Sequence, residues 1–591
     1  MTWLLIILLP LLLALPGRAA LSRPGVLRWL LPLAAVPALW AGLGVPPLDG
    51  GAHLPGLLLG TSCGLDGMRR TVLLLAALLW GFSGWHAAGS LRGDAHPARF
   101  AVFFLLSMAG NFGLIIAEDV VLFYTSFVLM SLSAFGLVIH RQDGKARRAA
   151  RIYLIMAMIG ELALLASIYL AVREAGAVEL ARIAEAVADA PGRNAILLTA
   201  FVGFGIKAGA VPLYFWLPLA HPAAPPPASA VLSGSMIKAG LIGLTHFFPV
   251  GLADLPGWGV VFIALGCVAG FGAVWIGLYQ TDPKTALAYS SISQMGWMTV
   301  LLGIGVATPE AWPALAPGLA FFIWHHGLAK GALFLGSGLA VGGAAGRLWI
   351  TGGLVLAALV LAGAPLTSGA AAKYALKEGA AWAPGVWHGL LPWLIPLSSL
   401  ATALLMGRFL MLCDGKMVAG GQSSEFRGRK RAGGRCAGGG MVLSWGVLVV
   451  LAVVGWRVPG LLAGGAEVSG GGRGIVALAE VAWPLVAAGV VLVVWRRVAG
   501  AVDPGAAPRV PPGDAVVWIE RGWSVFFGWW NRRGLPNPTR WALNLVPLSD
   551  RLLDTMEERS VIDRSERRIG TWRAVGIFFL LLVLLFFVSF V

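Results

Sequence analysis

The chain has 591 residues, of which 58% are hydrophobic and 12% are charged. A soluble domain is about 45–50% apolar and about 25% charged, so this composition excludes a soluble globular protein and a disordered chain. The net charge of +16 comes from basic residues in loops between apolar runs, which is typical of membrane orientation signals and not of nucleic-acid binding. The four cysteines form no CxxC pair and no nucleotide-binding motif occurs, so we expect no metal and no nucleotide or redox cofactor.

Apolar runs of roughly 20 residues recur along the whole length, which predicts an all-α polytopic membrane protein. Because the runs are continuous rather than alternating, a β-barrel is not expected. We predict sixteen transmembrane helices, centred near residues 11, 35, 80, 107, 130, 161, 206, 238, 268, 296, 328, 363, 399, 449, 485 and 582. Three of them fall in residues 1–97, ten in 98–411, two in 441–497 and one in 573–591.

The distribution of Lys and Arg predicts the orientation in the membrane. Basic loops follow the first, fifth, thirteenth and fifteenth predicted spans, and such loops stay in the cytoplasm. Because all four spans are odd-numbered, we expect both termini on the outer, periplasmic side of a bacterial inner membrane. Residues 412–440 are predicted to be a Gly- and Arg-rich cytoplasmic linker. The first span lacks a basic n-region, so we expect a retained helix rather than a signal peptide.

Residues 498–572 form a long hydrophilic stretch. Between residues 518 and 533, six Trp and Phe residues lie among three arginines. This mixture favours an amphipathic segment at the inner membrane interface, and the alternative is a loop anchored by its aromatic side chains. Together with the span at 573–591, residues 515–572 are a candidate contact for a neighbouring subunit.

Lysines inside apolar spans carry most of the functional information. The chain has nine lysines against 35 arginines, yet Lys207, Lys238, Lys330 and Lys373 all lie within predicted spans. A charged side chain at the bilayer centre costs at least about 2.5–3.5 kcal/mol. Arg keeps its proton in proteins, whereas a buried Lys can release it. The interior lysines therefore indicate proton exchange, and the alternative is that they brace helices by pairing.

One carboxylate and one histidine accompany these lysines. Glu161 lies ten residues beyond Arg151, where the sixth span enters from the inside, so its depth is roughly 15 Å. His326 precedes Lys330 by four residues, so the two share a helix face, and histidine titrates near neutral pH. We predict a mid-membrane proton relay of lysines, Glu161 and His326. For His326 the alternative is a simple hydrogen bond between helices.

Two predicted spans contain a proline next to glycines. Pro212 follows Lys207 in the seventh span, and Pro365 precedes Lys373 in the twelfth. A proline frees backbone groups, which a span tolerates where it lines a cavity. Interrupted helices at matching places in two halves mark the ion site of inverted-repeat transporters. We therefore predict broken helices at both places, five spans apart.

Five segments in collinear order resemble one family of membrane proteins. They are residues 119–135, 207–240, 281–296, 325–338 and 364–379. The family comprises the antiporter-like, proton-translocating subunits of respiratory complex I, of membrane-bound hydrogenase and formate hydrogenlyase complexes, and of Mrp-type cation/proton antiporters. The resemblance implies two inverted five-helix repeats, at about 98–250 and 255–411, connected by a charged axis at mid-membrane.

The resemblance also implies roles for individual residues. The matching positions are Lys207 and Lys373 for the lysines of the broken helices, Lys238 for the connecting lysine, and His326 and Lys330 for a T-H-x-x-x-K pattern in which His325 replaces the threonine. Two positions depart from the family. Val128 stands where span 5 usually has a glutamate, and Leu219 stands where an LPDAH-like motif has its aspartate.

The missing carboxylate leaves two interpretations. Either Glu161, at the same depth as Val128, has become the partner of Lys207, or the first half no longer pumps. We favour the relocated carboxylate because the lysines remain.

The sequence thus predicts a proton-translocating, antiporter-like subunit of a multisubunit energy-converting complex, with other membrane subunits as partners. The complex would be an oxidoreductase of the NADH:quinone or hydrogenase type, in which this subunit does no redox chemistry. One alternative is a Na⁺/H⁺ antiporter subunit of Mrp type. Another is a non-pumping structural or partner-binding subunit, including one that powers uptake by a peripheral protein.

Overall fold

A computed structural model provides the structure of the protein. It describes residues 2–15, 21–44, 51–55, 58, 60–341, 347–414, 439–455 and 482–493. The chain divides into two units, residues 1–513 and 514–591, and all described residues belong to the first. The predicted linker at 412–440 lies mostly outside the described residues. The hydrophilic stretch at 498–572 and the span at 573–591 lie entirely outside them.

The described residues of the N-terminal part form four helices and a small hairpin. They are α1 (Thr2–Leu13), α3 (Pro24–Leu33), α4 (Val36–Gly42), β1 (Ala52–Leu54), β2 (Thr61–Cys63) and α5 (Gly67–Ser90). The two strands pair antiparallel, with Ala52 opposite Cys63. Asp66 caps α5 by accepting a hydrogen bond from the Arg69 amide. Burial acts to raise the pKa of Asp66, but the charge and hydrogen bonds of Arg69 outweigh it and hold that pKa below its usual value.

The next helices hold the first half of the central region. They are α6 (Pro97–Ile116), α7 (Val120–Val138), α8 (Gly144–Ala175), α9 (Leu180–Asp189), α10 (Arg193–Ala208), α11 (Leu217–Ala223), α12 (Pro226–Val231), the π-helix η1 (Leu232–Met236) and α13 (Lys238–Phe247). Asp119 and Asp143 cap α7 and α8 by accepting from backbone amides three residues later. Such caps satisfy amides that a helix start leaves unpaired, so the two aspartates fix where these helices begin.

The second half follows in chain order. It consists of α14 (Pro256–Leu278), α15 (Pro283–Ala307), the short 3-10 helix η2 (Pro309–Ala311), α16 (Trp312–Val341), α17 (Arg347–Ala362), α18 (Ser368–Ala380) and α19 (Val386–Asp414). Helices α14 and α15 approach closely at Gly266 and Gly296. A Cβ added to Gly296 would lie 2.6 Å from the Gly266 carbonyl oxygen, so only glycine permits this contact. Small residues play this role between membrane helices.

Two further described helices follow the second half. They are α21 (Gly439–Val454) and the helix Ala482–Val493. Helix α21 packs against α5, α16 and α17. The ring of Trp445 on α21 lies close to Gly353 on α17, and a Cβ added to Gly353 would lie 2.4 Å from Cη2 of that ring. Helix α21 therefore packs one face against the helices of the central region.

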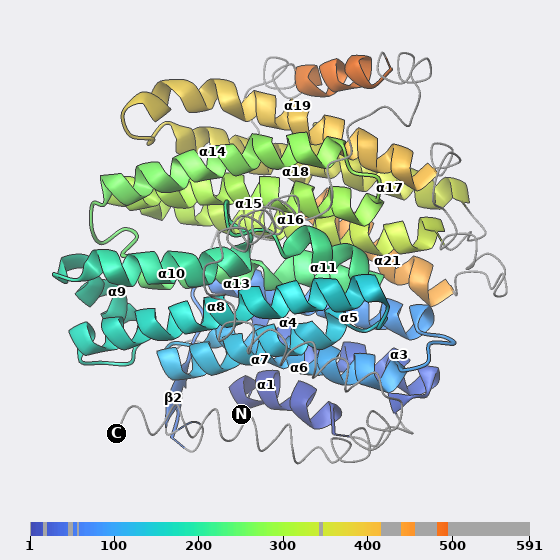
Figure 1. The fold of residues 1–591 in the computed structure, drawn as a ribbon, viewed down its shortest axis with the longest axis horizontal. Coiled ribbons are helices and arrows are strands. Elements are labelled where there is room, and N and C mark those ends of the chain that lie inside the picture. Colours follow the sequence, from blue (N-terminus) through green and yellow to red (C-terminus); the bar gives the residue numbers. More distant parts are fainter. Residues whose placement is uncertain are drawn as a thin grey trace, which may run out of the picture. The chain divides into compact units, whose positions relative to one another are not determined.

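The helices of the first unit lie along one common direction (Figure 1). Within the described ranges, nine helices are long and apolar enough to cross a membrane, so the protein is a multi-pass membrane protein. The buried share of each helix distinguishes the central helices from the peripheral ones. The most apolar 18-residue window of α15 is 100% buried, whereas that of α8 is 33% buried. Helix α15 therefore forms the centre, and α8 presents one apolar face outward and its other face to the site described next.

Candidate functional site

The helix that carries Lys207 is interrupted. Helix α10 ends at Ala208, and the next residue, Gly209, has a positive φ of 70°. Glycine adopts this left-handed conformation without a steric penalty and commonly closes helices. Residues 209–216, including Pro212, are not helical, and α11 starts at Leu217. Lys207 therefore lies in the last turn before the break.

The second interruption, between α17 and α18, also begins at a glycine with a positive φ. Helix α17 ends at Ala362, Gly363 has a φ of 90°, and α18 starts at Ser368. Pro365 lies in the connecting segment. A Cβ on Gly363 would lie 3.3 Å from Cγ of Lys373, so the stem of the lysine side chain packs against the glycine of the break.

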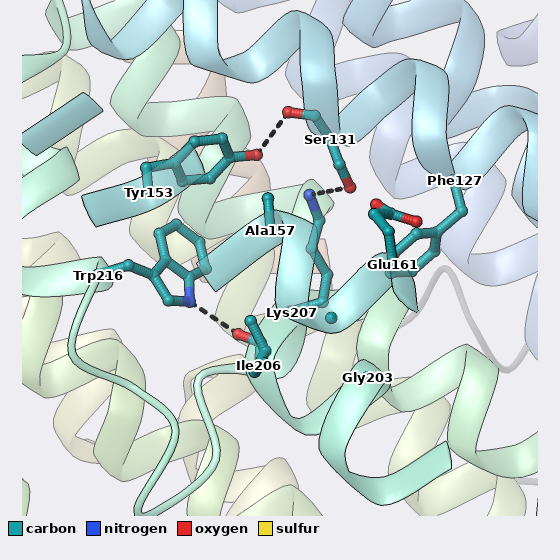
Figure 2. Close-up of a pocket in the computed structure, with 10 residues that line it drawn as sticks. Phe127, Ser131, Tyr153, Ala157, Glu161, Gly203, Ile206, Lys207 and Trp216 are labelled. Carbon is teal, nitrogen blue, oxygen red and sulfur yellow. Dashed lines mark hydrogen bonds between the residues drawn. The ribbon is translucent and has the colours of Figure 1, made fainter. Parts of the chain in front are cut away.

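Lys207 and Glu161 line one pocket (Figure 2). The Lys207 ammonium donates a 3.0 Å hydrogen bond to Oγ of Ser131 on α7. The Ser131 hydroxyl also interacts with the Glu161 carboxylate and lies between the two charged groups. Oε2 of Glu161 is buried and has no hydrogen-bond partner among the described residues. The structure therefore brings a lysine, a hydroxyl and a carboxylate from three helices together.

Aromatic side chains form the walls of this pocket. The Lys207 ammonium lies 5.6 Å from the Phe127 ring centre and 6.0 Å from that of Tyr153. The Tyr153 hydroxyl donates to the Ser131 carbonyl at 2.7 Å. Trp216 Nε1 donates to the Ile206 carbonyl at 2.7 Å, and the Gly209 amide donates to the same carbonyl at 3.2 Å, so two donors hold the end of α10.

Both positions that depart from the family are buried but lie outside the set of residues that line the pocket. Val128 is 6% exposed and precedes Ser131 by three residues on α7, and Leu219 on α11 is 9% exposed. The ten residues that line the pocket include one carboxylate, Glu161 on α8. The carboxylate that lines the pocket with Lys207 therefore comes from α8 and not from α7.

A second cluster lies around the π-helix η1. The Lys238 ammonium donates to the Ser233 carbonyl at 2.7 Å and lies 2.6 Å from Nδ1 of His326 on α16. A π-helix spaces its backbone hydrogen bonds one residue wider than an α-helix and is common at functional sites. Here the Ser233 carbonyl inside η1 accepts from a lysine side chain.

Lys330 joins the same cluster from α16. Its ammonium donates to the Leu287 carbonyl at 2.8 Å. The Ser291 hydroxyl donates to that carbonyl at 3.0 Å and lies 2.7 Å from the Ser233 hydroxyl. A chain of polar contacts thus connects Lys238 with Lys330 through the fully buried centre.

Lys373 has its own hydroxyl partner. Its ammonium donates to Oγ of Ser398 on α19 at 2.7 Å and lies 5.7 Å from the Trp297 ring centre. The Ser398 hydroxyl donates to the Ile395 carbonyl at 2.6 Å. The structure does not bring Lys373 into direct contact with the cluster around Lys238.

The sequence reasoning missed two groups of residues. Ser131 and Ser398, which bond the two lysines of the broken helices, each share an apolar helix with at least one other serine, and no residue pattern distinguishes them. His221 is fully buried, stacks on Phe334 with 4.5 Å between ring centres, and interacts electrostatically with three lysines. One of these is Lys284, which donates to the Ala224 carbonyl at 2.6 Å. His221 and Lys284 both lie in segments that resemble the family, at 207–240 and 281–296. This resemblance is the sequence signal that could have identified them.

Comparison with known proteins identifies this region. A family model described as "NADH:quinone oxidoreductase/Mrp antiporter, TM" matches residues 117–381. Hydrogenase-4 component B of Escherichia coli K12 is 36% identical over 258 residues, covering 42% of this chain and 38% of that protein. A protein of Rhizobium meliloti 1021, described by its name as part of a probable K(+)/H(+) antiporter, is 30% identical over 292 residues, covering 46% of this chain and 28% of that protein.

The fold also has solved counterparts. The structure of the Mrp complex from Dietzia sp. DQ12-45-1b contains a chain that matches with a TM-score of 0.68 and 22% identity, covering 95% of this chain and 63% of that one. The chain spans only 38% and 28% of the two curated relatives it matches. The resemblance inferred from the sequence motifs is confirmed, since the same family is found. Residues 117–381 of the chain therefore match the family described as "NADH:quinone oxidoreductase/Mrp antiporter, TM".

Proposed function

We propose that the chain is a proton-translocating, antiporter-like subunit of a multisubunit energy-converting membrane complex. The observation that carries the proposal is the pocket in which the Ser131 hydroxyl lies between Lys207 and Glu161. A buried lysine and a buried carboxylate exchange a proton readily, because each is costly to keep charged away from water.

The proposed first step is a proton transfer inside this pocket. An N–H bond of the Lys207 ammonium breaks and the proton passes to the Ser131 oxygen, while the Ser131 hydroxyl proton passes to the Glu161 carboxylate. Lysine becomes neutral, glutamate becomes a neutral acid, and serine is unchanged. In this proposal Glu161 has the role that the glutamate of span 5 has elsewhere in the family.

The later steps use the remaining lysines. Lys238, His326 and Lys330 relay protons through the centre, supported by the 2.6 Å contact between the Lys238 ammonium and Nδ1 of His326. Lys373 delivers or takes protons in the second half. The helix breaks at Pro212 and Pro365 serve as the places where each lysine side chain changes partner, and residues 98–250 and 255–411 form the two inverted repeats of a sixteen-helix protein.

The remaining parts of the proposal concern location and partners. We place the chain in a bacterial inner membrane, with both termini on the periplasmic side, among other membrane subunits. The relative from a hydrogenase and the match to a chain of an Mrp complex support such an assembly. The Rhizobium relative supports a second candidate, exchange of protons for another cation. Val128 and Leu219 support a third, a structural subunit that has lost transport.

Proton flux separates these candidates. The full chain, purified with the subunits that accompany it and reconstituted in liposomes, is compared with its Glu161→Gln variant. We expect a loss of roughly 100-fold, the size typical of a lost proton-transfer group. Glu185→Gln, at an exposed site on α9, is the matched control. Unchanged flux in an assembled Glu161→Gln complex would favour the structural subunit, and flux that requires Na⁺ or K⁺ would favour cation exchange.

A further inference from the structure

His325 has a chain of hydrogen bonds of its own. This residue on α16 is 2% exposed. Its Nδ1 lies 2.9 Å from Oγ of Ser368, the first residue of α18. The Ser368 hydroxyl in turn donates to the Ala452 carbonyl of α21 at 2.5 Å. Three helices thus meet at one serine.

This arrangement determines where the histidine carries its proton. A hydroxyl has one proton, and Ser368 gives it to the Ala452 carbonyl. The Ser368 oxygen is therefore the acceptor of the bond to Nδ1, so Nδ1 of His325 holds a hydrogen. In the neutral ring Nε2 is then the free base, because the bond at one ring nitrogen sets the state of the other.

His325 contacts the helix that carries Lys373, because its hydrogen-bond partner Ser368 and Lys373 both lie on α18. The charged groups that act on His325 electrostatically are Lys373 in the second half and Lys238 in the centre. His326, the next residue, contacts Lys238 directly. Among the hydrogen bonds of the described residues, none links Lys373 directly to the central cluster. A proton relay from that cluster to Lys373 therefore requires a group between them.

We propose that His325 is the proton-relay residue that connects the central cluster of Lys238, His326 and Lys330 to Lys373. The proposal rests on the proposed function. In the relay, Nε2 of His325 takes a proton from the central cluster, where an N–H bond breaks as the new one forms. The imidazolium then returns its Nε2 proton to the neutral amine of Lys373, while Ser368 keeps the Nδ1 proton in place.

Helix α21 has a positioning role in this relay although it lies outside the segment that matches the family model, residues 117–381. Besides the Ala452 carbonyl, two hydrogen bonds hold it against α16. Trp324 Nε1 donates to the Gly455 carbonyl and Trp445 Nε1 donates to the Ala332 carbonyl, both at 2.9 Å. These bonds hold the Ala452 carbonyl in place, and this carbonyl determines through Ser368 which ring nitrogen of His325 carries the hydrogen.

The test is proton flux of the reconstituted full chain with its accompanying subunits. His325→Thr restores the residue of the T-H-x-x-x-K pattern and removes the ring, and we expect a loss of at least about tenfold. His388→Thr makes the same change at an exposed histidine and is expected to keep wild-type flux. Lys373→Ala tests the proposed function in the second half by itself. Loss in Lys373→Ala with full flux in His325→Thr overturns the relay alone, whereas full flux in Lys373→Ala overturns the function proposed for this half.

Ser368→Ala supplies a second and independent readout. Without the hydroxyl, Nδ1 of His325 loses its acceptor while the ring remains, so we expect the pH profile of flux to shift. The same Ser368→Ala change in a His325→Thr background is then expected to have no further effect on that profile. A profile identical to wild type in Ser368→Ala would overturn the positioning by α21.

Discussion

The two lysines of the broken helices bind a serine in the same way, but their serines differ. Ser131, which bonds Lys207, also interacts with the Glu161 carboxylate. Ser398, which bonds Lys373, gives its proton to the Ile395 carbonyl of its own helix. Among the described residues no carboxylate acts on Lys373 electrostatically.

This difference shows that a lysine beside a helix break does not define one kind of site. In the first half the hydroxyl lies between two groups that can exchange a proton. In the second half the hydroxyl holds the ammonium but leads to a carbonyl, which cannot take a proton. We therefore propose that the first site exchanges its proton with an acid and that the second exchanges it with basic neighbours such as His325.

Replacing Lys207 is the strongest way to break this comparison. Lys207→Ala is expected to reduce proton flux by roughly 100-fold, because no other described ammonium lines the pocket. Lys207→Arg is expected to impair flux as well, since Arg keeps its charge but does not release its proton. Flux is measured in liposomes with equal amounts of assembled complex. A fully active Arg variant would refute the exchange of protons at this position.

A carboxylate returned to position 128 on α7 tests whether Glu161 on α8 has replaced it as the partner of Lys207. Val128 lies one helical turn from Ser131 on α7, so Val128→Glu places an acid near the same pocket. We expect Val128→Glu to restore much of the flux that Glu161→Gln loses, measured in the double variant. Val128→Gln in the Glu161→Gln background is the control for size and polarity. If the double variant with the new carboxylate folds but shows no recovery, the interpretation of a relocated partner fails.

The two serines allow a direct test with matched changes. Ser131→Ala removes a hydroxyl from a path between two charged groups, and we expect about a tenfold loss of flux, the size of a lost hydrogen bond to a charged group. Ser398→Ala removes a hydroxyl that only holds Lys373, so its effect is expected to be smaller. Equal losses in the two variants would contradict the difference drawn between the halves.

Trp216→Phe is expected to have the smallest effect. It keeps the aromatic wall of the pocket but removes the donor to the Ile206 carbonyl. A lost hydrogen bond of this kind costs about 1 kcal/mol, so we expect a modestly lower unfolding temperature in detergent and nearly normal flux. A large loss of flux with unchanged stability would instead place Trp216 on the proton path.

Much of the site follows from residue types that are unusual in a membrane. Lysines in apolar helices cost so much that their positions are informative, and this is why Lys207, Lys238, Lys330 and Lys373 stand out in the sequence. Glu161 stands out for the same reason, and the structure places it beside Lys207. A serine costs little in a helix, so Ser131 and Ser398 give no such signal.

Other features depend on contacts between distant segments. The bond from Ser368 to Ala452 joins residues 84 positions apart, and no local pattern encodes it. The π-helix η1 has an ordinary sequence, LSGSM, and its geometry depends on the packing around it. The sequence of α21 is that of one more apolar span, whereas the structure shows that one of its faces packs against α5, α16 and α17.

The π-helix also has a consequence for how such a chain can change over time. Each residue of an α-helix turns the chain by about 100°. Removing one residue from η1 and closing it into an α-helix would therefore rotate Lys238 by about that angle, away from His326. A single deletion in Leu232–Met236, with every charged residue retained, would break the contact between Lys238 and His326 through which we propose that protons pass. Insertions and deletions here are thus expected to be far less tolerated than substitutions.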